Sequence, residues 1–558
     1  MARTYTDQAS SPRWRARAFG AALFGGLMVV LAFPTVGFVV PILFAFAPAL
    51  VMTRELSWKR RLRMGWLLGF VYHMVLFRWI AFTMTQMTNL PDLANWGMVV
   101  LYAGWHGLMI GVFFALAEPA RRAAEARIVG AGPVAIGLVF VAVEWLFPTL
   151  FSWSMGHAFW EIGPLAAGGA LTGIYGQAFV IMVVNAWVAR AWLGRRETLA
   201  RGVTRPSLVR RLTPALLACI PLLGFGVIWH QYVNTAPRYA TLSVAVLQPN
   251  YTLDEKRRAS RGTSKARAAQ RLEFMDRIEG MLRALPHGEL DLVVGPEGGF
   301  PYLWRVDADR FDAADLAVPL AVRKTQRFQK AVAEGPAAHT IIGGLRAPGE
   351  GHTRTRNAAV HLAPSGMIRG FYDKQTLVPF SEYLPGRDWF PGLAKSIQGV
   401  GNFGAGDQPC AFDVDGISVG CGICYETLLA DPTREDLGSA RLLVNLTIDT
   451  WFGSTTAPWF HLMTHTTRAA ELAVPLVRAG LTGISAFIDA DGTILKSLPL
   501  DTSGTLVHDL ILRDVTSPYR VLGRWFCWLA LALALLLLND ARQRRGELFG
   551  QPVVEEPS

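Results

Sequence analysis

Three side chains of complementary chemistry each end a segment that the sequence predicts as a strand. Glu297 ends LDLVVGPE, Lys374 ends RGFYDK, and Cys424 ends ISVGCGIC. Strand ends are where α/β folds gather polar groups, because the loops there converge on one crevice. We therefore expect a carboxylate, an amine and a thiol to lie together.

Such a set suits acyl transfer at a cysteine. The thiolate is the attacking form, and a free thiol with a pKa near about 8.5 is only a few per cent ionised at pH 7. A carboxylate can remove the thiol proton, and an ammonium group can stabilise both the thiolate and a developing oxyanion. The three residue types therefore predict acyl-transfer chemistry.

The remaining cysteines allow other interpretations. Cys421 and Cys424 form C-G-I-C, which also occurs in thioredoxin-like redox sites. That interpretation requires the motif to open a helix in a small βαβ unit, and it gives Glu297 and Lys374 no role. We therefore interpret Cys421 as a packing residue. Five cysteines are too few for a disulfide framework, and three of them (Cys410 with the C-G-I-C pair) leave at least one free thiol.

Two histidines are spaced as metal ligands can be. His461 and His465 stand four residues apart on a predicted helix, as in helical zinc motifs. The sequence supplies no evident third ligand, so we expect solvated or hydrogen-bonded histidines and no metal.

The elements that must position these residues lie in the interval 237–515. Short β-rich runs at 242–247, 290–294, 340–344 and 441–446 alternate there with helical stretches at 262–284 and 458–473. This alternation predicts an α/β domain with its own core.

The rest of the chain reads as a polytopic α-helical membrane bundle of eight spans. Apolar runs long enough for a hydrocarbon layer of about 30 Å lie near 17–34, 35–53, 64–83, 95–118, 130–149, 171–193, 213–231 and 521–539. The predicted domains are therefore a membrane domain at 1–236 with seven helices, a catalytic domain at 237–515, and an eighth helix with a tail at 516–558.

Basic residues predict the orientation of the spans. Arginine and lysine gather in the N-terminal tail and near 54–63, 121–127, 190–211 and 542–545, whereas the loops near 34–36, 84–94 and 150–170 contain neither. Because positive loops stay in the cytoplasm, we expect both termini there. The domain at 237–515 is then extracytoplasmic.

The composition agrees with a membrane protein. Hydrophobic residues make up 51% and charged residues 17%, against about 25% charged residues in soluble domains. The net charge of +11 comes mostly from arginines between apolar runs. No zinc-finger or RNA-binding signature accompanies them, which argues against nucleic-acid binding.

Several motifs together resemble a known family. The Glu297, Lys374 and Cys424 set resembles the nitrilase, or carbon–nitrogen hydrolase, superfamily. KQTLVPFSEYLP (374–385), TWFG (450–453) and RAAELAVPLVRA (468–479), joined to eight spans, resemble the apolipoprotein N-acyltransferase family. The resemblance implies an αββα sandwich, with Glu297 as general base, Lys374 as stabiliser of the tetrahedral intermediate and Cys424 as acyl-carrying nucleophile. It also implies a bacterial inner membrane, with the catalytic domain on the periplasmic side.

The same resemblance implies supporting residues. Glu382 matches a glutamate that supports the site, although a surface carboxylate remains the alternative. Tyr425 and Glu426 would shape the wall or serve only as structural support. Trp451 and Phe452 would flank a lipid entrance or merely fill the core.

The implied reaction has two steps. The thiolate attacks a phospholipid ester, typically of phosphatidylethanolamine, leaving a thioester. The amine of a diacylglyceryl-modified N-terminal cysteine on an apolipoprotein then accepts the acyl chain. No metal or organic cofactor is implied.

The sequence departs from the family pattern at four positions. Gly295 replaces a tryptophan, Ile448 and Leu481 replace asparagines, and Val474 replaces an arginine. These changes bear on the identity of the acceptor.

Two other functions stay open. A membrane-tethered amidase acting on a small extracytoplasmic amide would use the same three residues. A transporter or receptor would make them coincidental, and the few charges within the spans disfavour an ion-coupled transporter.

Overall fold

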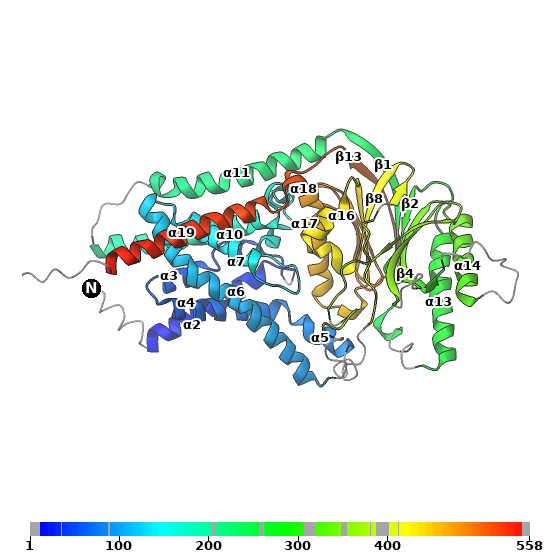
Figure 1. The fold of residues 1–558 in the computed structure, drawn as a ribbon, viewed down its shortest axis with the longest axis horizontal. Coiled ribbons are helices and arrows are strands. Elements are labelled where there is room, and N and C mark those ends of the chain that lie inside the picture. The colour runs from blue at the N-terminus through cyan, green and yellow to red at the C-terminus, as the bar shows by residue number, and fades with distance from the viewer. Residues whose placement is uncertain are drawn as a thin grey trace, which may run out of the picture. The chain divides into compact units, whose positions relative to one another are not determined.

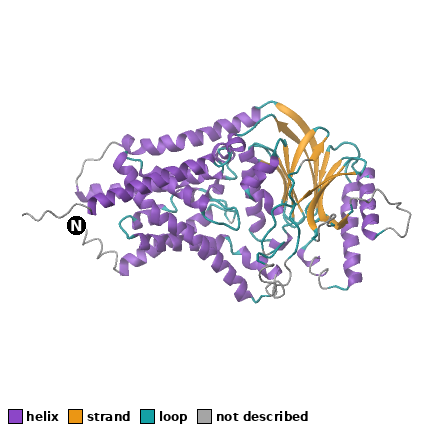
Figure 2. Cartoon of the chain, viewed as in Figure 1, coloured by secondary structure: helices purple, strands orange, loops and turns teal. Residues whose placement is uncertain are grey.

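The chain forms two compact units in a computed structural model that describes residues 12–34, 36–87, 90–201, 208–255, 258, 262–305, 319–347, 354–379, 381–386, 401–410 and 412–549. One unit comprises 1–80, 96–229 and 521–558, and the other comprises 81–95 and 230–520. The strands belong to the second unit, whereas the first is built from helices (Figure 2). The domain bounds drawn from the sequence stay a prediction.

Long apolar helices build the first unit (Figure 1). Its elements are α2 (Pro12–Leu31), η1 (Val40–Leu43), α3 (Ala47–Thr53), α4 (Trp58–Leu76), α6 (Asp92–Arg127), α7 (Gly132–Leu146), η2 (Met155–Phe159), α8 (Gly163–Ala166), α9 (Gly169–Thr172), α10 (Ile174–Arg201), α11 (Leu208–Thr235) and α19 (Trp525–Phe549). α7, α10, α11 and α19 share an apolar cluster that includes Val141, Phe179 and Cys527. The buried Asn185 amide bonds to the backbone at Ile42 and Phe46 and so joins α10 to the segment around η1.

Four helices in the described part of the chain are long and apolar enough to cross a membrane. These helices are Asp92–Arg127, Ile174–Leu193, Thr213–Thr235 and Trp525–Arg544. A fifth span arises if Trp58–Leu76 and α5 (Trp79–Met87), which meet at a bend of 55°, count as one. Ala16–Leu31, Val40–Thr53 and Gly132–Leu146 are shorter apolar helices. Each of the eight apolar runs in the sequence thus overlaps an apolar helix, whereas the number of spans stays a prediction.

Two sheets form the second unit. The seven-stranded sheet has the order β13-β1-β2-β4-β5-β6, with β3 also pairing with β4, and the six-stranded sheet has the order β12-β11-β10-β9-β8-β7. The strands are β1 (Arg238–Gln248), β2 (Leu292–Val294), β3 (Phe300–Trp304), β4 (His339–Arg346), β5 (Arg356–Leu362), β6 (Ile368–Asp373), β7 (Phe412–Val414), β8 (Ile417–Ile423), β9 (Leu442–Thr447), β10 (Leu476–Gly480), β11 (Ser485–Ile488), β12 (Ile494–Leu498) and β13 (Gly504–Arg513).

The two sheets face each other across one apolar core. Val244 and Ile341 of the first sheet and Val419, Val444 and Val477 of the second belong to the same buried cluster. The centres of both sheets are parallel, as in the pairs β1–β2 and β8–β9. Strands of this kind are buried on both faces, which explains their nearly continuous apolar sequences.

Helices cover both outer faces of the sandwich (Figure 1). α13 (Ser264–Arg283) and α14 (Leu320–Glu334) pack on the seven-stranded sheet through Phe274, Ile278 and Phe328. α16 (Ala430–Leu437) and α17 (Ala457–Leu472) cover the six-stranded sheet. The expected αββα sandwich is therefore present, with each predicted strand and helix of this interval at its place.

Candidate active site

The turns that follow β2, β6 and β8 carry Glu297, Lys374 and Cys424. Lys374 is 1% exposed and Glu297 is 6% exposed, so both charges are removed from water. The turn of Glu297 lies directly against β4, where a Cβ atom on Gly343 would lie 2.6 Å from the Glu297 Cα atom. A glycine at position 343 is therefore needed for this close approach.

Lys374 lies between two carboxylates. Its Nζ atom is 2.9 Å from Oε1 of Glu382 and 4.0 Å from Oε1 of Glu297. The Asn357 side-chain amide donates to both carboxylates, at 2.7 Å to Glu297 and 3.2 Å to Glu382. The backbone N–H of Val378 donates to the second oxygen of Glu382 at 2.8 Å. Glu382 is thus a buried member of this network, not a surface carboxylate.

These neighbours decide the charge of Lys374. Burial alone lowers the pKa of the ammonium group, but Glu297, the Cys424 sulfur and Glu382 raise it by more, so that its net pKa lies above the ordinary value. The ammonium group is therefore charged at neutral pH and available to stabilise an anion.

Cys424 begins the 3₁₀ turn η4 (Cys424–Leu428) in a left-handed backbone conformation, with φ of +52°. Non-glycine residues adopt this region rarely, and it recurs at functional turns. The carbonyl oxygen of Cys424 accepts hydrogen bonds from Thr427 Oγ1 at 3.2 Å and Asn445 Nδ2 at 3.4 Å. These bonds hold the turn that carries the thiol.

The thiol of Cys424 is protonated at rest. Burial and then the carboxylate of Glu297 raise its pKa to about 12, although Lys374 and a hydrogen bond from Thr447 act in the opposite direction. A nucleophilic attack by this sulfur therefore needs a base close by. Glu297 is an electrostatic neighbour of the thiol and can take that proton.

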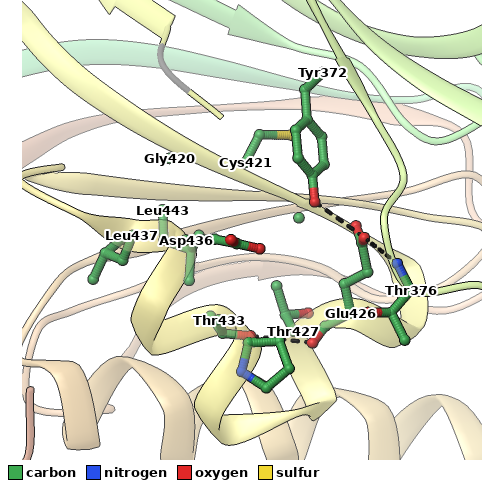
Figure 3. Close-up of a pocket in the computed structure, with 12 residues that line it drawn as sticks. Tyr372, Thr376, Gly420, Cys421, Glu426, Thr427, Thr433, Asp436, Leu437 and Leu443 are labelled. Atoms are coloured by element: carbon green, nitrogen blue, oxygen red, sulfur yellow. Dashed lines mark hydrogen bonds between the residues drawn. The ribbon is translucent and has the colours of Figure 1, made fainter. Parts of the chain in front are cut away.

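Glu426 joins the turns of Lys374 and Cys424. Its carboxylate accepts hydrogen bonds from the backbone N–H groups of Ile423 at 2.7 Å, Gln375 at 2.6 Å and Thr376 at 3.0 Å, and from the Tyr372 hydroxyl at 3.0 Å. Figure 3 shows Tyr372 and Thr376 converging on this carboxylate. Four donors on one buried carboxylate fix the end of β6 relative to the end of β8.

A second buried network lies next to the thiol. Asp449 Oδ2 is 2.5 Å from Arg478 Nη2, and its Oδ1 accepts from His461 Nδ1 at 2.9 Å. Burial raises the pKa of Asp449, but Arg478 and His461 lower it by more, so the carboxylate is ionised. A Cβ atom on Gly483 would collide with this carboxylate, so glycine is required there.

The histidines therefore have structural partners. Burial and Arg478 lower the pKa of His461, and the nearby Asp449 carboxylate raises it by less. The His461 ring is therefore neutral. His465 Nδ1 bonds to the His461 carbonyl oxygen at 2.6 Å. Within the described ranges, no group of three His, Cys, Asp or Glu side chains could hold a metal ion.

The other residues predicted for the site are half-buried. Burial and the nearby Tyr383 raise the pKa of the Tyr425 hydroxyl, whereas Lys374 lowers it. Trp451 and Phe452 form the 3₁₀ turn η5 (Thr450–Phe452) directly after Asp449. A Cβ atom on the next residue, Gly453, would lie 2.7 Å from the ring of Phe82.

Three of the four departures from the family pattern lie in one apolar cluster. A side chain at Gly295 would meet Ile342, and Ile342 belongs to the cluster between the seven-stranded sheet and α13. Leu481 is a buried member of the same cluster, and Ile448 packs against it. These replacements therefore fit one another as an apolar core.

The sequence did not predict three further residues that contact the site: Asn357, Asp449 and Arg478. Asn357 lies on the apolar strand β5. A polar side chain at such a position is the one feature of the sequence that could have pointed to it. Arg478 lies likewise within the apolar strand β10. A buried charge of this kind needs a partner, and only the fold identifies which one.

Two family models match this chain. The carbon-nitrogen hydrolase family matches residues 243–519, and the apolipoprotein N-acyltransferase N-terminal domain matches residues 25–187. Proteins named apolipoprotein N-acyltransferase align along almost the whole chain. The relative from Geobacter metallireducens is 28% identical over 95% of this chain and 96% of its own length. That from Bdellovibrio bacteriovorus is also 28% identical over 95% and 96%, and that from Caulobacter vibrioides is 29% identical over 94% and 95%. The chain belongs to the apolipoprotein N-acyltransferase family and carries the catalytic domain of the carbon–nitrogen hydrolases.

Proposed function

We propose that this protein transfers an acyl chain from a phospholipid to the N-terminal amine of a diacylglyceryl-cysteine apolipoprotein, through a thioester on Cys424. The observation that carries the proposal is the half-buried Cys424 thiol with the buried Glu297 and Lys374 as its electrostatic neighbours, in a chain with both family matches.

In the first step, Glu297 takes the thiol proton and the sulfur attacks the ester carbonyl carbon. The developing oxyanion lies near the Lys374 ammonium group, which Glu382 and Asn357 hold in place. Preorganised charge of this kind stabilises the tetrahedral intermediate without reorganisation during the reaction. The carbon–oxygen bond then breaks, and the lysophospholipid leaves with the proton from Glu297.

In the second step, the acceptor amine attacks the thioester carbonyl carbon. Glu297 takes the amine proton, the carbon–sulfur bond breaks, and the proton returns to the Cys424 sulfur. The thioester divides one slow ester-to-amide exchange into two faster reactions. Tyr425 and Glu426 form the wall of the site in this scheme, and Trp451 and Phe452 flank the path of the acyl chain.

The membrane part of the proposal has eight spans, with both termini in the cytoplasm and the catalytic domain outside. It is supported by the distribution of arginine and lysine and by the apolar helix that overlaps each predicted run. Phosphatidylethanolamine is the proposed donor. This arrangement brings acyl chains to the thiol from the bilayer.

The acyl-enzyme tests the proposal directly. Purified protein is incubated with phosphatidylethanolamine vesicles and then digested for mass spectrometry. We expect the mass of one acyl chain on the peptide that contains Cys424, and its loss when a diacylglyceryl lipopeptide is added.

Two controls complete this experiment. Cys424→Ala should give no adduct, whereas Cys219→Ala, a cysteine of the helical unit, should give a normal one. Phosphatidylglycerol vesicles in parallel test the head group. An active Cys424→Ala protein, or turnover without any adduct, would contradict the mechanism.

A further inference from the structure

Two cysteines outside the proposed chemistry lie side by side at one edge of the six-stranded sheet. β7 pairs with β8 in antiparallel register, with Phe412 opposite Val419 and Val414 opposite Ile417. Cys410 lies two residues before β7, and the same register continued to that position would bring it opposite Cys421. Cys410 Sγ is 3.6 Å from the carbonyl oxygen of Val419, and Cys410 adds to the burial that raises the pKa of the Cys421 thiol.

This arrangement meets the geometric requirement for a disulfide. Residues directly opposite in an antiparallel pair have Cα atoms about 4.5–5.5 Å apart. Disulfides join cysteines whose Cα atoms are about 4.4–6.8 Å apart. Both thiols are free in the present structure.

The nucleophile has different surroundings. Cys421 belongs to the apolar core between the sheets and lies beside the Tyr372 ring (Figure 3). Cys424 packs against the edge of the same core, but Glu297, Lys374, Asp449 and Thr447 also act on the pKa of its thiol. Cys410 is therefore the better placed disulfide partner of Cys421, although Cys424 is nearer along the chain.

We propose that Cys410 and Cys421 form a disulfide, which leaves Cys424 as the free thiol of the catalytic unit. The inference rests on the proposed function for the extracytoplasmic placement, because disulfides persist in such compartments. With Cys421 bonded to Cys410, no disulfide can form between Cys421 and Cys424, and the nucleophile stays reduced.

The chemistry is thiol–disulfide exchange with an external disulfide as the oxidant. Cys410 is half-buried whereas Cys421 is buried, so the external disulfide reaches the Cys410 sulfur first. The Cys410 sulfur, after losing its proton, attacks one sulfur of the oxidant, forms a mixed disulfide and releases one thiol. The Cys421 sulfur, after losing its proton, then attacks the Cys410 sulfur and releases the second thiol. Two cysteines are oxidised, and one external disulfide is reduced to two thiols.

Oxidation of the full-length protein in detergent tests the pairing independently of topology. Protein is treated with oxidised glutathione, denatured, alkylated with iodoacetamide and digested without reductant. We expect a peptide linked through Cys410 and Cys421, together with alkylated Cys424, Cys219 and Cys527. Five alkylated cysteines, or a link or glutathione adduct at Cys424, would overturn the proposal.

Activity after the same treatment adds a second readout. The unsubstituted protein should keep its activity, whereas Cys410→Ser should lose most of it as Cys421 becomes available to Cys424. Cys410→Ser combined with Cys421→Ser should be resistant again. If oxidised unsubstituted protein is inactive, or if Cys410→Ser is as resistant as the double variant, the protective role is wrong.

A third experiment, in cells, distinguishes failure of the disulfide from failure of the proposed acyl transfer. Cells are quenched with acid and their thiols are blocked before lysis, and the same peptides are analysed. The linked peptide should be present in cells. If the disulfide forms in detergent but the two thiols are reduced in cells, the disulfide in vivo and the extracytoplasmic placement are both refuted. Acyl-enzyme on Cys424 in the same digests would still support acyl transfer.

Discussion

Lys374 lies closer to Glu382 than to Glu297, at 2.9 Å against 4.0 Å between charged atoms. The shortest contact of the ammonium group is therefore with a carboxylate that has no assigned chemical step. Glu297 stays 4.0 Å from the ammonium group and is the proposed general base.

Replacement of Glu382 tests this division of roles. In Glu382→Gln the side chain can still accept a hydrogen bond, but Lys374 is drawn toward Glu297 and weakens it as a base. A charged hydrogen bond contributes about 1.5–3 kcal/mol. We expect kcat for acyl transfer to fall by roughly 10–100-fold, measured with a fluorescent lipopeptide. Glu435→Gln, which removes an exposed carboxylate, is the control and should change little. An unchanged kcat in Glu382→Gln would remove it from the site.

Replacement of Lys374 should affect both rate and stability. Lys374→Met should lower the rate by about 10²–10³-fold, the usual loss of an electrostatic stabiliser. It also leaves Glu297 and Glu382 buried without their cation, which costs about 3–5 kcal/mol. Lys374→Met combined with Glu382→Gln should therefore recover part of the thermal stability and none of the activity. Equal melting temperatures for the single and double variants would count against the ion pair.

The pKa of Cys424 predicts an unusual response to alkylation. Because the pKa is about 12, the thiolate fraction should rise about tenfold per pH unit from pH 7 to 9. The rate of iodoacetamide labelling at Cys424 should rise equally steeply. In Glu297→Gln the loss of the carboxylate lowers this pKa, so labelling should become faster at each pH although turnover falls. Slower labelling in that variant would contradict the electrostatic role of Glu297.

The buried pair of Asp449 and Arg478 predicts a stability effect. In Asp449→Asn the guanidinium group of Arg478, which is 0% exposed, loses its counter-charge. Uncompensated buried charges cost about 3–5 kcal/mol. The melting temperature of the catalytic unit should fall clearly, followed by fluorescence in detergent. The control is Glu435→Gln at an exposed pair, where about 1 kcal/mol or less is expected.

The parts of the site that depend on neighbouring residues in the chain could be predicted from the sequence. Glu297 and Cys424 were predicted because each follows an apolar strand. The alternation of strands and helices predicted an α/β domain, whereas the αββα sandwich was expected from the family resemblance. The pairing between distant segments was not accessible. Asn357 bridges two carboxylates, and Glu426 joins the ends of β6 and β8, through contacts that only the assembled sheets create.

The interpretation of Cys421 shows the same limit. As a single residue it reads as a small packing group, and the structure does place it in the core. Its proximity to Cys410 depends on the register of β7 and β8, which the sequence does not specify. The apolar runs likewise predicted where helices lie, but three of those helices are shorter than a full span.

The backbone of Cys424, with φ of +52°, has one more consequence. A left-handed residue with a side chain costs about 1–2 kcal/mol, and glycine does not pay this penalty. Cys424→Gly should therefore unfold at a higher temperature than Cys424→Ala, in contrast to the usual ranking. The turn that carries the proposed nucleophile is thus less stable than a glycine at position 424 would make it.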